Sequence, residues 1–165
     1  MQIAELNVLD RNGFVNALGW VFENSPWVAA RAWACRPFST VENLYLAMTA
    51  EVEKASEAEQ LSLLRSHPDL GTRARIGTAS AAEQAGAGLD SLTEAEFEQL
   101  HRLNSMYKTR FGFPFLFAVK GSRKIDILRS LEQRIGHSRD VEYREALRQV
   151  YRIAEFRLRD TIGDY

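Results

Sequence analysis

Helix-start signals recur along this chain, and they constrain its fold more than any other feature. In a capping box, a Ser or Thr N-cap and a Glu three residues later satisfy each other's free backbone groups. Four pairs have this spacing: Ser39 with Glu42, Ser56 with Glu59, Ser80 with Glu83, and Thr93 with Glu96. Each pair precedes a stretch that predicts a helix, over residues 41–54, 57–65, 81–87 and 94–110.

The rest of the chain is also predominantly helical in pattern. Further helices are predicted over residues 11–22, 27–35, 123–135 and 139–162. The last is the most regular, because apolar residues step by three and four along one face: Tyr143, Leu147, Val150, Tyr151, Ala154, Leu158 and Ile162. With 165 residues, 45% of them hydrophobic, and no repeat or long linker, the sequence predicts an all-α, single-domain bundle of about eight helices over residues 1–165.

Composition and charge exclude several classes of protein. The formal net charge is −1 and the arginines are scattered, so a nucleic-acid partner is not expected. The longest uncharged stretch, residues 12–22, is too short to span a membrane. The N-terminus lacks a basic region followed by an apolar run, and Cys35 is a single cysteine, which predicts a buried, inert thiol. These features predict a cytoplasmic protein.

One segment, residues 111–119, breaks the helical pattern. It carries no charge and four phenylalanines, and Gly112 and Pro114 disfavour both helix and a central strand. No second run of similar character is present to pair with it. Its backbone N–H and C=O groups therefore need other partners, either side chains and water or a polar ligand.

His67 is the histidine best placed for chemistry. Pro68 follows it and predicts that the preceding helix ends there, which would hold the imidazole at a helix end. An imidazole titrates close to neutrality and suits general acid–base catalysis. Two other interpretations remain open at this point: a turn histidine that bonds carbonyls, and a metal ligand together with Asp69. The metal interpretation lacks the third protein ligand that zinc or iron sites need, so no metal is predicted.

Glu83 and Arg157 each have a structural and a functional interpretation. Glu83 fits a capping box with Ser80, or it faces a ligand together with Ser80 and Gln84 at a helix N-terminus. Arg157 falls at the edge of the apolar face of the last helix. Its guanidinium either extends to water or binds a carboxylate or a planar polar ligand.

Five motifs, taken together, resemble those of the 2-oxo-4-hydroxy-4-carboxy-5-ureidoimidazoline (OHCU) decarboxylases in order and in approximate spacing. They are Phe22–Ala29 (FENSPWVA), Ser66–Gly71 (SHPDLG), Ser80–Leu89 (SAAEQAGAGL), Tyr107–Phe115 (YKTRFGFPF) and Ile153–Leu158 (IAEFRL). The resemblance covers almost the whole chain. One departure is residues 71–75, where many relatives continue Leu-Ala-Gly-Lys.

The resemblance implies an all-helical lyase that decarboxylates OHCU to (S)-allantoin, the last step of urate degradation to allantoin, without a cofactor. It implies a small-molecule substrate and a homodimer. His67 and Glu83 correspond to the catalytic groups of the family. The residues that would bind the substrate are Pro68, Ser80, Gln84, the main chain of Phe115, Leu116, Phe117, Ala118 and Val119, and Arg157.

Two alternatives remain. The chain could be a non-catalytic helical module that binds a ureide or purine metabolite in the same pocket. It could also be a hydrolase of a ring amide or ureido group, with His67 activating water. Retention of both His67 and Glu83 argues against a binding module, since binding alone does not require two proton-transfer groups.

Overall fold

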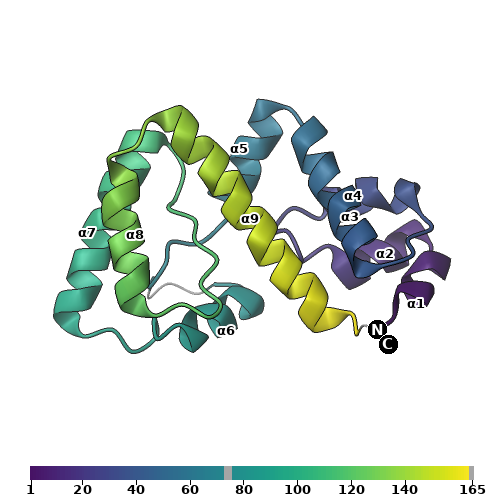
Figure 1. Ribbon diagram of the computed structural model, residues 1–165, viewed down its shortest axis with the longest axis horizontal. Coiled ribbons are helices and arrows are strands. Elements are labelled where there is room, and N and C mark those ends of the chain that lie inside the picture. The colour runs from purple at the N-terminus through teal and green to yellow at the C-terminus, as the bar shows by residue number, and fades with distance from the viewer. Residues whose placement is uncertain (73–75, 164–165) are drawn as a thin grey trace. The chain divides into compact units, whose positions relative to one another are not determined.

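The computed structural model describes residues 1–72 and 76–163, and within them it is all-α (Figure 1). These residues form nine α-helices and one 3-10 helix, and no strand occurs among them. The prediction of an all-α fold is confirmed, with nine helices instead of about eight. The elements are α1 (Ile3–Val8), α2 (Arg11–Leu18), α3 (Trp27–Ala32), η1 (Trp33–Cys35), α4 (Val41–Lys54), α5 (Glu57–Arg65), α6 (Thr78–Gly86), α7 (Glu94–Phe111), α8 (Lys124–Ile135) and α9 (Arg139–Thr161).

The chain divides into two compact units. Residues 1–66 and 151–165 make up the first, and residues 67–150 make up the second. Helices α1–α5 belong to the first unit and α6–α8 to the second, while α9 contributes its N-terminal half to the second unit and its C-terminal half to the first. Organisation as a single domain stays a prediction.

The first unit is built from short helices around an apolar core. Helix α3 packs against both α2 and α4. Phe14, Leu44 and Met48 contribute side chains with no exposed surface. Helix α1 was not predicted, because six residues are too few to show a period. Tertiary contacts hold it instead: the Asn7 amide donates to the Phe38 carbonyl and accepts from the Phe38 N–H, both at 2.8 Å.

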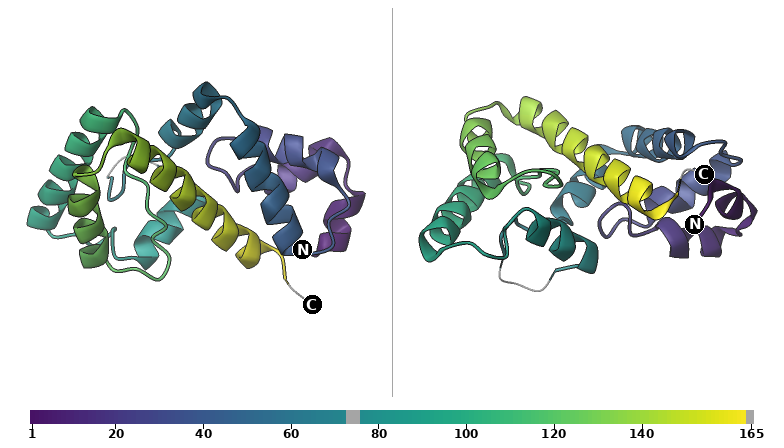
Figure 2. Two further views of the ribbon diagram at one scale, coloured as in Figure 1. Left: turned by 45° about the horizontal axis from the view of Figure 1, so that its top comes forward. Right: turned by 60° about the horizontal axis from the view of Figure 1, so that its bottom comes forward.

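The second unit has an aromatic core. Figures 1 and 2 show α7 and α8 side by side, and the two helices are in contact. Tyr107 is fully buried, and the centre of its ring lies 4.6 Å from the centre of the Phe111 ring and 5.4 Å from the centre of the Phe115 ring. Gly112 ends α7 in the left-handed conformation, with φ of 81°, which glycine adopts without strain.

Capping explains which helix boundaries were predicted well. The Ser56–Glu59 and Thr93–Glu96 boxes are present, and α5 and α7 begin where they predict. The Ser39–Glu42 box is wrong, because Thr40 is the N-cap of α4 and accepts from the Asn43 N–H at 3.1 Å. Helix α2 ends at Leu18 and not at residue 22, and the predicted helix over 27–35 is divided between α3 and η1.

Three other sequence predictions can be compared with the fold. Residues 112–119 are neither helix nor strand, as predicted, although Phe111 is the last residue of α7. Cys35 is exposed, so the prediction of a buried thiol is wrong. The described helices include none with the length and apolar character needed to cross a membrane. Residues 73–75 belong to the stretch 71–75, in which the sequence differs from the motif described above, and they lie outside the described residues.

Candidate active site

His67 lies on the loop that follows α5. That helix ends at Arg65, as Pro68 predicts, and only 8% of His67 is exposed. A solvated turn histidine would be far more exposed, as His101 is on α7. The imidazole is therefore held in a mostly buried position at a helix end, which suits a group that must be oriented for proton transfer.

The loop after His67 is held by two amide side chains. The Gln84 Oε1 atom accepts from the Gly71 N–H at 2.9 Å, and the Asn104 Nδ2 atom donates to the Leu70 carbonyl at 3.0 Å. Gly71 has φ of +69°, and a Cβ atom on it would lie 2.5 Å from a methyl carbon of Leu100. A side chain at position 71 would be strained at this φ and would have to displace Leu100, so glycine suits this turn of the loop.

Ser80, Glu83 and Gln84 share one face of α6, since they lie at positions i, i+3 and i+4. Ser80 and Gln84 are buried, and Glu83 is half-buried. The predicted capping box of Ser80 with Glu83 is wrong, because α6 begins at Thr78 and its N-cap is Gly77. Glu83 therefore does not serve as a helix cap.

The segment of residues 115–119 runs through the second unit with its side chains packed inward. Phe115, Leu116, Ala118 and Val119 are at most 5% exposed, and Phe117 is half-buried. The Leu116 carbonyl and the Ala118 N–H are each bound by a side chain. The predicted need for partners outside a sheet is thus met in part by side chains.

Arg157 belongs to the first unit and is 4% exposed, so its guanidinium does not extend to water. It forms an ion pair with Glu23, with 3.0 Å between Nη1 and Oε2, and it donates to the Trp20 and Val21 carbonyls at 3.3 Å. Glu23 was not singled out from the sequence. Its signal was a lone acidic residue after the apolar run that ends at Phe22.

Arg134 and Glu142 form a buried ion pair that the sequence analysis did not identify. Arg134 also bonds the 115–119 segment at the Leu116 carbonyl. Glu142 has no exposed side-chain surface, and its Oε1 atom accepts from Arg134 Nε at 2.8 Å and from the Tyr107 hydroxyl. Burial and the hydrogen bond to Glu142 raise the pKa of Tyr107. The spacing of Ile127, Leu131 and Arg134 on α8 would have placed Arg134 on the buried face of that helix.

The second unit therefore contains most of the predicted site residues. His67 and Pro68 lie on its loop, Ser80, Glu83 and Gln84 on α6, and residues 115–119 on the segment between α7 and α8. A cavity of about 240 Å³ lies against the same loop, lined by Asp69–Thr72, Phe97, His101 and Asn104. None of the predicted catalytic residues lines this cavity.

The metal interpretation of His67 and Asp69 gains no support from the geometry. The Asp69 carboxylate forms an ion pair with Lys108 Nζ at 3.4 Å. Across residues 1–72 and 76–163, no three His, Cys, Asp or Glu side chains are grouped closely enough to hold a metal ion.

The structure is a small all-α protein with a buried histidine, His67, and a half-buried carboxylate, Glu83, which are side chains of the kind that transfer protons in enzymes. Comparison with known proteins gives its family: the family model for OHCU decarboxylase matches residues 7–159. A 2-oxo-4-hydroxy-4-carboxy-5-ureidoimidazoline decarboxylase from Haloferax volcanii is 49% identical over 158 residues, which cover 96% of this chain and 94% of that protein. The chain belongs to the OHCU decarboxylase family, as the five motifs predicted.

Solved structures agree with this assignment. A crystal structure of (S)-allantoin synthase matches with a TM-score of 0.79 and 33% identity over 98% of this chain. This chain covers 54% of that protein, about half its length. A crystal structure of OHCU decarboxylase in the presence of (S)-allantoin matches with a TM-score of 0.73 and 23% identity, over 87% of this chain and 96% of that one, and supports the fold.

Proposed function

We propose that this protein is a carboxy-lyase that converts OHCU to (S)-allantoin, the last step of urate degradation to allantoin, without a cofactor. Family membership over residues 7–159 supports the reaction class. The similarity to (S)-allantoin synthase supports the product.

The substrate explains how the reaction proceeds with protein side chains alone. Its carboxylate is attached to a ring carbon that also bears a hydroxyl, next to a carbon–nitrogen double bond. When carbon dioxide leaves, the electron pair of the broken bond forms a ring double bond, and the imine nitrogen takes up a proton. The resulting enol is then protonated on carbon while its hydroxyl loses a proton and becomes a carbonyl. The substrate thus acts as its own electron sink, a role that cofactors have in other decarboxylases.

The protein must orient the carboxylate and manage these proton transfers on one face of the ring. In this proposal His67 and Glu83 carry the proton transfers, and Pro68 forms part of the pocket wall. Within the second unit, the remaining substrate contacts come from Ser80, Gln84 and the main chain of residues 115–119, and the family resemblance assigns a substrate contact to Arg157 as well. The Arg157 guanidinium supplies planar, charge-assisted donors to the polar edge of the substrate.

One observation carries the proposal: the face of α6 that bears Glu83 is attached to the loop of His67. The Gln84 Oε1 atom bonds the Gly71 N–H at 2.9 Å, and Ser80 and Glu83 share the face of Gln84. Gly77 and not Ser80 caps α6, so the capping box that was the structural interpretation of Glu83 is not formed.

The decisive experiment supplies the purified protein with substrate generated by uricase and hydroxyisourate hydrolase. Carbon dioxide release, and (S)-allantoin formation followed by circular dichroism, should both be faster with the protein than without it. The variant His67→Asn, which cannot exchange a proton near neutrality, should lower turnover by at least about 10²-fold. His101→Asn is the matched control, because His101 is an exposed histidine of α7, and it should retain full turnover.

Each outcome separates the alternatives. If His67→Asn retains more than about a tenth of wild-type turnover, the role of His67 is wrong. Binding of allantoin without carbon dioxide release by the wild-type protein would favour the non-catalytic module. Hydrolysis products in place of carbon dioxide would favour the hydrolase.

We extend the proposal to the location and the oligomeric state of the enzyme, which we propose to be a cytoplasmic homodimer. The single cysteine, Cys35, is consistent with a reducing compartment, and the family resemblance supports the dimer. Light scattering coupled to gel filtration would test the dimer, since a molecular mass equal to that of one 18.8 kDa chain would contradict it.

A further inference from the structure

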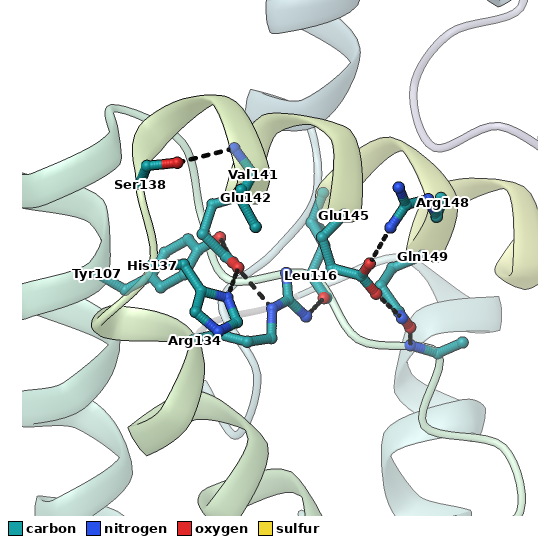
Figure 3. Close-up of polar contacts among 11 residues, drawn as sticks. Tyr107, Leu116, Arg134, His137, Ser138, Val141, Glu142, Glu145, Arg148 and Gln149 are labelled. Carbon is teal, nitrogen blue, oxygen red and sulfur yellow. Dashed lines mark hydrogen bonds and ion pairs between the residues drawn. The ribbon is translucent and has the colours of Figure 1, made fainter.

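Two side chains form hydrogen bonds with the main chain of the 115–119 segment (Figure 3). Arg134 Nη1 on α8 donates to the Leu116 carbonyl at 2.7 Å. The Gln149 Oε1 atom on α9 accepts from the Ala118 N–H at 2.9 Å. Arg134 and Gln149 are 5% and 6% exposed, so both bonds form away from water, where the loss of a partner is costly.

Each of these side chains is itself held in place. Arg134 pairs with the fully buried Glu142, and its guanidinium lies 4.5 Å from the centre of the Phe115 ring. Gln149 Nε2 donates to Glu145 at 2.8 Å, which turns the Gln149 oxygen toward Ala118. Such support fixes the orientation of both partners before any ligand arrives.

The charge of Glu145 stabilises this arrangement. Burial acts to raise the pKa of Glu145, but hydrogen bonds from Gln149 and Arg148 hold that pKa below its ordinary value. The Arg148–Glu145 ion pair has 2.7 Å between its nearest nitrogen and oxygen atoms. Glu145 therefore remains an acceptor at neutral pH, and Gln149 cannot flip its amide without losing that bond.

The spacing of these two hydrogen bonds, at Leu116 and Ala118, determines where the N–H and C=O groups of Phe117 point. In an extended chain, the C=O of one residue and the N–H two residues later face the same side, while the groups of the residue between them face the other side. Leu116 and Ala118 have this relation, so Phe117 presents its N–H and C=O away from Arg134 and Gln149. Within residues 1–72 and 76–163, those two groups of Phe117 have no hydrogen-bond partner.

We infer that Gln149 and Arg134 are positioning residues for substrate recognition: they bind the main chain of Leu116 and Ala118 so that the N–H and C=O of Phe117 meet the planar amide edge of the substrate ring. The inference rests on the proposed function. An adjacent donor and acceptor suit an amide or ureide, which presents the complementary pair.

The test uses Gln149→Met, which keeps the length of the side chain and removes its hydrogen bonds. KM and the dissociation constant of (S)-allantoin should rise about tenfold, the loss expected for one hydrogen bond, while kcat stays within about twofold. The matched control is Gln60→Met, because Gln60 is another buried amide, 8% exposed, which donates to the Val52 carbonyl at 2.8 Å in the other unit. It should leave both constants unchanged.

A swapped pair provides the rescue. In Glu145→Gln combined with Gln149→Glu, the carboxylate moves to position 149, where it accepts from both the Ala118 N–H and the amide introduced at position 145. Allantoin affinity should return to within about twofold of wild type, since the bond to Ala118 is restored. A loss equal to that of Gln149→Met would overturn the inference.

A measurement on the wild-type protein keeps the inference testable if a variant fails to fold. On adding (S)-allantoin, the Phe117 amide should gain protection from hydrogen exchange, while the Ala118 amide, already bound by Gln149, should not change. Unchanged allantoin affinity in Gln149→Met, or protection of Ala118 without Phe117, would overturn the inference and leave the proposed function intact. Wild-type protein that neither releases carbon dioxide nor binds allantoin would overturn the proposed function, and the inference with it.

Discussion

The buried carboxylate of Glu142 provides the strongest test of what holds the second unit together. It has no exposed side-chain surface and accepts from Arg134 Nε at 2.8 Å, from His137 Nδ1 at 2.9 Å and from the Tyr107 hydroxyl (Figure 3). The variant Glu142→Gln keeps the shape of this side chain but removes its charge. Arg134, 5% exposed, would then be a buried cation that has lost the carboxylate it is paired with.

The expected loss follows from these contacts. Removing one partner of a buried ion pair costs about 3 to 5 kcal/mol, because the remaining charge is left uncompensated. Each hydrogen bond to a charged group contributes about 1.5 to 3 kcal/mol, but an amide oxygen in the position of Oε1 could still accept from both Arg134 and Tyr107, so the loss of the negative charge is the main effect. The cost of breaking the ion pair gives an expected loss of about 3 to 5 kcal/mol in the free energy of unfolding for Glu142→Gln.

Urea unfolding followed by circular dichroism would measure this loss. The control is Glu42→Gln, since Glu42 pairs with Arg159 at 3.2 Å on the surface, with about half of each side chain exposed, and this variant should change the midpoint little. The double variant Arg134→Met with Glu142→Leu should lose less than the two single variants added together, because no charge remains buried. A loss below about 1 kcal/mol for Glu142→Gln would refute this account of the ion pair.

Three further predictions concern single side chains. Glu83→Gln should leave the unfolding midpoint unchanged, because Glu83 caps no helix, and should lower turnover at least about 10²-fold; a fully active variant would return Glu83 to a structural role. Arg157→Lys should weaken allantoin binding by about 1.5 to 3 kcal/mol in calorimetry through loss of the planar donors, and equal affinity would remove Arg157 from the site. The hydrogen bond from Arg31 lowers the pKa of Glu59 to about 2, so the stability this carboxylate contributes is present above about pH 4.3, its unfolded value, and is lost as the pH falls toward 2. An NMR titration of Glu59 should show the low midpoint and its return toward the ordinary value in Arg31→Met.

Local signals in the sequence determined the helices whose ends are set by neighbouring residues. Helix α5 begins and ends where it was predicted, because Ser56 and Glu59 satisfy each other's backbone groups within one turn and Pro68 follows closely. The break in helix after Phe111 was predictable for the same reason, since Gly112 and Pro114 act on their own backbone. Family motifs then identified His67 and Glu83 as candidate catalytic residues.

The tertiary structure decided the partners of the polar side chains. Arg134 bonds a carbonyl 18 residues away, and Gln149 bonds an N–H 31 residues away, and no local rule relates such positions. Arg157 likewise pairs with Glu23, near the other end of the chain, where the sequence alone left water, a carboxylate and a planar polar ligand open. Backbone propensity acts over a few residues, whereas the partner of a buried charge depends on which distant segments the core brings together.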